Sequence, residues 1–167
     1  MNRNGSVRDI VLFAVVFFTI VLGLFVISFT GTTIYNGLVT APVVAGSTPT
    51  VSALGGINTV TARFDFMALG VFIGLILGTI ITGWLVGGHP LFMLGYILVV
   101  AITVSITAVL ANSWEQITAF SQFATTLTTF PIANHLVLYL PLYVSVVGFI
   151  GIIVMFAKPM FQDMGGV

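Results

Sequence analysis

Charge is the scarcest property of this chain. Of its 167 residues, four are Lys or Arg and four are Asp or Glu, or 5% of the sequence, whereas a soluble domain carries roughly 25% charged residues. Apolar residues make up 59%, and the mean hydropathy is +1.23. These values exclude a water-soluble globule. The few basic residues are also scattered, so the sequence has no basic patch with which to bind nucleic acid.

Cysteine is absent altogether, which excludes disulfides, thiolate nucleophiles, iron–sulfur clusters and Cys-ligated zinc. The sequence holds two histidines, His89 and His135, and a single glutamate, Glu115. It contains no glycine-rich phosphate loop, no Ser–His–Asp set and no metal-ligand spacing. We therefore expect no enzyme activity, no catalytic or metal-binding residue and no cofactor.

The chain does contain four apolar runs long enough to cross a bilayer, since about 20 residues span the hydrocarbon core. The sequence predicts one all-α integral membrane domain over residues 1–167, with transmembrane helices over 10–29, 66–86, 91–111 and 136–156. The phenylalanines of the first run are expected to face lipid. Pro141 lies inside the last run and is expected to bend that helix, because proline removes a backbone donor.

The connections differ in character. Residues 31–65 form a polar outer connection in which Asn36 and Gly37, typical of a type I′ turn, favour a short β-hairpin. The short turn at 87–90 predicts that the second and third helices form a tight antiparallel hairpin. Polar and apolar residues recur in 113–130 with the period of a helix, which indicates an amphipathic helix lying in the membrane interface. The expected interface anchors of that helix are Trp114, Phe120, Phe123 and Leu127.

Small residues recur every fourth position in the second helix, at Gly70, Gly74, Gly78 and Thr82. In a membrane this spacing lets another helix backbone approach closely. The third helix offers a matching row, at Gly95, Thr103, Thr107 and Ala111. Because the tight turn returns the third helix onto the second, we expect these two rows to pack together. A further small surface in the fourth helix is then left for other chains: Ser145, Gly148 and Gly151.

His135, Tyr139 and Tyr143 are spaced by four and share one helix face near the outer boundary. One interpretation is an aromatic belt, because tyrosine is enriched at membrane interfaces. The other is a path for protons or a head-group site for a ligand, with His135 as the titrating member. The belt is the favoured interpretation. His89 is assigned to the opposite side, so the two histidines are not expected to flank one haem iron.

Four crossings place Arg3, Arg8 and Lys158 on one side and Arg63 on the other. By the positive-inside rule, this distribution predicts that both termini are cytoplasmic.

Three functions remain open. The first hypothesis is a structural or accessory subunit, in an energy-converting complex or in the membrane of a lipid-containing virus. Its partners would be membrane lipid and other membrane subunits or copies of itself. The second is an oligomeric pore or holin-like channel lined by Thr103 and Thr107. The third is a redox-complex subunit that touches a quinone or haem through His135.

Overall fold

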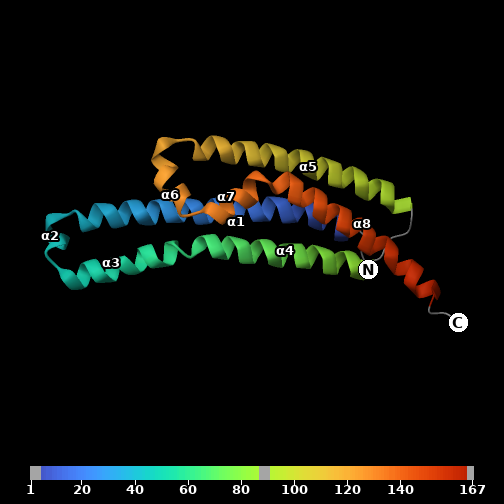
Figure 1. Cartoon of the computed structure of the whole chain (residues 1–167), viewed down its shortest axis with the longest axis horizontal. Helices are drawn as coiled ribbons and strands as arrows, with labels where there is room; N and C mark the ends of the chain where they lie inside the picture. The colour runs from blue at the N-terminus through green and yellow to red at the C-terminus, as the bar shows by residue number, and fades with distance from the viewer. Residues whose placement is uncertain (1–4, 87–90, 165–167) are drawn as a thin grey trace.

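The computed structural model of this chain describes residues 5–86 and 91–164, and every element within them is helical (Figure 1). The prediction of an all-α chain is confirmed. In chain order the elements are α1 (Gly5–Val39), α2 (Pro42–Ala45), α3 (Thr48–Thr61), α4 (Phe64–Val86), α5 (Leu91–Thr118), the 3-10 helix η1 (Ser121–Phe123), α6 (Ala124–Thr128), α7 (Pro131–Leu138) and α8 (Leu140–Met164).

Within the described residues, three helical stretches are long and apolar enough to cross a membrane: Asp9–Val39, Thr48–Trp84 and Leu94–Thr118. A fourth arises if α7 and the first part of α8 count as one span, which is bent by 66°. The predicted bend near Pro141 is therefore present, with the helix interrupted at Tyr139. Pro141 lies in the first turn of α8. An N–H at this position would have no acceptor within the helix, so the N–H that proline lacks is not missed there.

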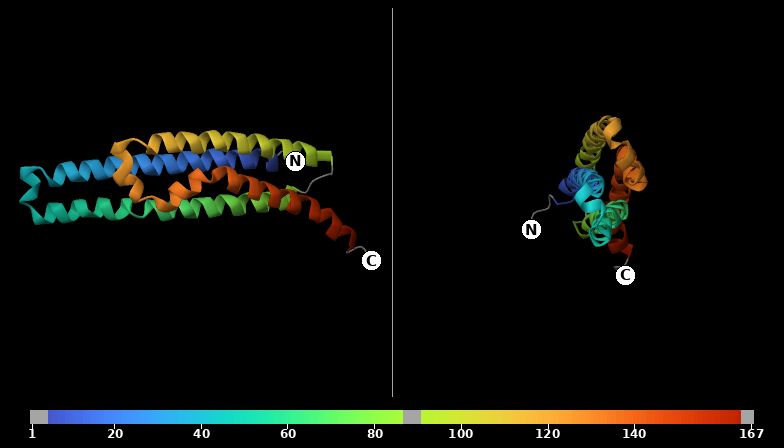
Figure 2. Two further views of the ribbon diagram at one scale, coloured as in Figure 1. Left: turned by 45° about the horizontal axis from the view of Figure 1, so that its top comes forward. Right: turned by 90° about the vertical axis from the view of Figure 1, so that its left-hand side faces the viewer.

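The bundle has four columns, arranged in the cyclic order α1, α4, α8 and α5. Each neighbouring pair in this order packs along its length, and α7 continues the α8 column, touching α4 and α5 (Figure 2). The helices α4 and α5 therefore stand at opposite corners and are not among the extensively packed pairs. The predicted packing of these two helices as a tight hairpin is wrong. The turn at 87–90 lies outside the described residues, and a short turn fixes an antiparallel direction without requiring contact.

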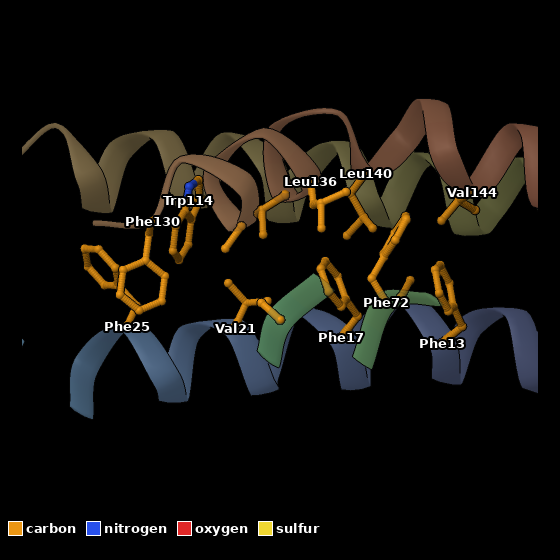
Figure 3. Close-up of a cluster of buried hydrophobic side chains, with 14 of the residues drawn as sticks. Phe13, Phe17, Val21, Phe25, Phe72, Trp114, Phe130, Leu136, Leu140 and Val144 are labelled. Atoms are coloured by element: carbon orange, nitrogen blue, oxygen red, sulfur yellow. The ribbon is translucent and has the colours of Figure 1, made fainter. Parts of the chain in front are cut away.

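Aromatic rings of α1 fill the space between the columns (Figure 3). Phe13, Phe17 and Phe25 are each at most 2% exposed. The ring of Phe72 on α4 lies 5.8 Å from that of Phe13 and 5.0 Å from that of Phe17. These three phenylalanines do not face lipid as predicted, because a four-column bundle has a wide centre that only large side chains fill.

The polar connection is mostly helical, made of the end of α1, the short α2 and α3, with brief turns between them. α1 continues to Val39 through the Asn36–Gly37 pair, so the predicted β-hairpin is wrong. Hydroxyls of threonines return to carbonyls of the same helix, as from Thr33 to Phe29 at 2.8 Å, and so satisfy polar groups without a strand partner. α3 packs antiparallel on α1, and together they project past α6 as an α1–α3 extension (Figure 1).

The interfacial segment is broken rather than continuous. α5 runs to Thr118, and η1 and α6 then lead back toward the bundle. Within this segment Thr126 is 4% exposed, and Phe130 is fully buried. The single amphipathic helix predicted over 113–130 is therefore wrong, because the helix is interrupted after Thr118 and most of its aromatic side chains pack into the core.

Candidate functional site

Asp65 is a buried carboxylate in the first turn of α4, 4% exposed. Its Oδ1 accepts a hydrogen bond from the backbone N–H of Ala133 at 2.7 Å, and its Oδ2 accepts one from that of Ile132 at 3.1 Å. Both N–H groups belong to the first turn of α7, which has no intrahelical acceptor for them. Asp65 therefore caps α7 from a different helix, and its charge also lies at the positive end of the α7 dipole.

Trp114 lies beside this cap and is fully buried. Its Nε1–H donates to Oδ1 of Asn134 on α7 at 2.8 Å. Its ring packs edge-on against Phe25 at 5.1 Å, and Phe25 also meets Phe130 at 5.7 Å. Trp114 was predicted to be an interface anchor. It is instead a core residue that ties α5 to the start of α7.

Of the other predicted anchors, two pack against the core and one is exposed. Phe123 packs its ring against Phe25 and Phe29, at 5.5 Å and 4.7 Å, and Leu127 is partly buried against the core. Phe120 is 61% exposed and remains free to meet lipid. The sequence pattern identified the apolar side of this segment but could not show that most of it turns inward.

His135, Tyr139 and Tyr143 are brought together. The His135 ring lies 4.5 Å from that of Tyr139 and 6.5 Å from that of Tyr143. His135 and Tyr139 are exposed, whereas Tyr143 is half-buried and touches Phe72 at 5.1 Å. The cluster thus leads from the bundle surface to the aromatic core, without an acidic partner among the described residues.

The two small-residue rows lie on different faces from those predicted. Gly70, Gly74 and Gly78 are exposed, and a Cβ placed on any of them would meet no atom within 4 Å. Thr82 is half-buried, and its hydroxyl donates to the carbonyl of Gly78 at 2.7 Å. This outward row, flanked by the half-exposed Ile73 and Leu77, is called the α4 groove below.

The α5 row turns toward the interior of the bundle except at Gly95, which is exposed. Thr103 and Thr107 are fully buried, and their hydroxyls donate to the carbonyls of Val99 at 2.7 Å and Val104 at 2.9 Å. Ala111 is 8% exposed. Because α5 packs on α8 and α1, this row does not meet the α4 groove, and the predicted pairing is wrong.

The α8 glycines pack against α5, which is the contact predicted for the small-residue row of α4. A Cβ on Gly148 would lie 2.7 Å from Cγ1 of Val100, and one on Gly151 would collide with the hydroxyl of Tyr96. Both contacts are with α5. The small surface expected to meet other chains is therefore part of the internal α5–α8 interface, and Ser145 donates its hydroxyl to the carbonyl of Pro141 at 2.8 Å.

Ionisable groups are sparse within the part of the chain that the structure describes. No group of three or more His, Cys, Asp or Glu side chains gathers there to hold a metal ion. Glu115 is exposed at the end of α5. His89 lies outside the described residues.

No protein-family model, no curated protein and no solved structure matches this chain.

Proposed function

We propose that this chain is a non-enzymatic structural subunit of a larger membrane assembly, and that the α4 groove receives a helix of a neighbouring subunit. The observation that carries the proposal is the exposure of Gly70, Gly74 and Gly78 on a helix otherwise suited to cross the membrane.

The physical argument begins with the penalty of glycine in a helix, about 1 kcal/mol relative to alanine. At Gly148 and Gly151 the close packing of α5 explains why the residue is glycine, because a Cβ there would clash with Val100 or Tyr96. In the α4 groove no such contact exists within the chain. Small residues at four-residue spacing allow close backbone approach of two membrane helices, with Ile73 and Leu77 as walls for the incoming side chains.

The sidedness proposed for this subunit follows from the position of its basic residues. Arg8 lies in the start of α1 and Lys158 near the end of α8, both at the end of the bundle opposite the α1–α3 extension (Figure 1). Arg63 lies toward the other end, between α3 and α4. This distribution favours cytoplasmic termini and an α1–α3 extension on the opposite side.

The pore alternative loses its lining residues in this arrangement. Thr103 and Thr107 are buried inside one chain, so they do not face a lumen formed between copies. The quinone or haem alternative is favoured by one observation, the exposed His135 ring, which lies 4.5 Å from the ring of Tyr139. This alternative predicts that His135→Ala changes the optical spectrum of the native complex or its retention of the ligand. If neither the spectrum nor the retention changes, the alternative is excluded.

Site-specific photocrosslinking in native membranes tests the proposed function. A photoreactive phenylalanine replaces Leu77 beside the α4 groove or, as the matched control, Leu98 on α5; these leucines are 53% and 60% exposed. We expect a discrete protein adduct from position 77 and lipid adducts from position 98. Lipid adducts alone from both positions would contradict the proposal.

A further inference from the structure

A second surface feature lies at the base of the α1–α3 extension. An open depression of about 630 Å³ is lined by Tyr35 of α1, by Gly55 and Thr59 of α3, and by Ala62, Arg63 and Phe66 at the α3–α4 junction. It is separate from the α4 groove. Its lining combines a cation, hydroxyl groups and one large apolar ring.

The charge of this depression is uncompensated. Arg63 is exposed, and its guanidinium forms no hydrogen bond or ion pair with the residues that the structure describes. The nearest carboxylate along the chain, Asp65, is turned inward to the N-terminus of α7. No acidic residue lines the depression, and the Tyr35 hydroxyl also has no hydrogen-bond partner within the described ranges.

The depression also lies where the chain changes from polar to apolar. Phe66, 67% exposed, begins the apolar outer face of α4, while the polar α3 lies on the other side of Arg63. Asp65 bonds to the start of α7, and Trp114 bonds to the same turn. Residue 63 therefore lies at the same level as the end of α5 that carries the exposed Glu115, where charged side chains gather at one end of the apolar columns.

We propose that this depression binds the phosphate group of an anionic phospholipid. The Arg63 guanidinium donates to the phosphate oxygens, for which its planar fork is well suited. The Tyr35 and Thr59 hydroxyls line the same space, and an acyl chain descends over Phe66. A headgroup of net negative charge is preferred over a zwitterionic one because the depression carries one unpaired positive charge.

Two measurements test this site in the full-length protein. The chain has three arginines, so the double variant Arg3→Lys, Arg8→Lys leaves Arg63 as the only arginine. In vesicles of phosphatidylcholine and phosphatidylglycerol, ¹⁵N-arginine labelling and ³¹P–¹⁵N dipolar recoupling should then detect phosphorus at hydrogen-bonding range of Arg63. Absence of dipolar coupling would overturn the proposal.

Native mass spectrometry measures the preference for the headgroup. We expect retained phosphatidylglycerol to fall roughly fivefold or more in Arg63→Gln, partly in Tyr35→Phe, and not in the charge-matched control Arg8→Gln. Equal retention by wild type and Arg63→Gln would overturn the proposal. A separate arm adds inorganic phosphate in detergent without lipid: saturation of Arg63 by phosphate that excludes phosphatidylglycerol would identify a soluble source and contradict the lipid.

Discussion

The Asp65 carboxylate on α4 accepts a 2.7 Å hydrogen bond from the backbone N–H of Ala133 on α7. These residues are far apart in sequence, and the bond is buried. A second oxygen of the same carboxylate takes the N–H of Ile132. This one side chain joins the α4 column to the α8 column, which α7 begins, at the point where the chain re-enters the bundle after α6.

Replacing Asp65 should lower stability strongly. Asp65→Ala leaves two N–H groups at the buried end of α7 without an acceptor, and the expected loss is about 2–4 kcal/mol in the free energy of unfolding. Asp65→Asn keeps one acceptor and should lose roughly half as much. Denaturant titration in a mild detergent measures both, and the exposed Glu115→Gln serves as the control, with an expected change within about 0.5 kcal/mol. Equal free energies of unfolding for Asp65→Ala and Glu115→Gln would refute the capping role.

The two tryptophans should report different surroundings. Trp114 is fully buried and Trp84 is 47% exposed on α4. In Trp84→Phe protein, the remaining emission should resist quenching by brominated lipid and by acrylamide. In Trp114→Phe protein, brominated lipid should quench Trp84. Strong lipid quenching of Trp114 would restore its original interpretation as an interface anchor.

Alanine at the α8 glycines should destabilise the bundle. Overpacking against Val100 and Tyr96 is expected to lower the free energy of unfolding by about 1–3 kcal/mol for Gly148→Ala and Gly151→Ala. Gly70→Ala in the α4 groove meets open space and should leave stability unchanged or raise it, because alanine favours the helix. Thermal unfolding in detergent compares the three variants, and a destabilised Gly70→Ala with unaffected α8 variants would invert this assignment.

The α1–α3 extension should be accessible to water. Because the chain lacks cysteine, single-cysteine variants can be labelled without background. Ser52→Cys on α3 should react with a membrane-impermeant maleimide in proteoliposomes, whereas Leu77→Cys on α4 should not. Protection of position 52 in both orientations of the protein would place α3 inside the bilayer.

Much of the architecture follows from the sequence because long uncharged apolar runs predict helices. Uncharged runs of spanning length must be helical where lipid surrounds them, and Pro141 must disturb its helix. The α7–α8 bend is therefore predictable. The order of the four columns is not, because α1, α4, α5 and α8 are each apolar on most of their surface, and the hydropathy pattern does not show which side meets protein.

The candidate sites illustrate the same limit. The Gly74 and Gly148 rows are both rows of small residues in an apolar helix, and only the position of Val100 and Tyr96 distinguishes an internal contact from an open groove. The cap that Asp65 provides to α7 could not be predicted, because an acceptor this far away along the chain leaves no local sequence pattern. The spacing of His135, Tyr139 and Tyr143 did predict that these residues would lie together, and their rings do.

One comparison tests the central claim most directly: Gly74→Leu in the native membrane, measured for both stability and assembly. We predict an unchanged free energy of unfolding for the purified protein, because the added side chain meets no atom of its own chain. On native gels the same variant should leave the larger assembly and migrate as the single subunit. A Gly74→Leu protein that unfolds, or that remains in the assembly at the wild-type level, would contradict the assignment of the α4 groove to a neighbouring subunit.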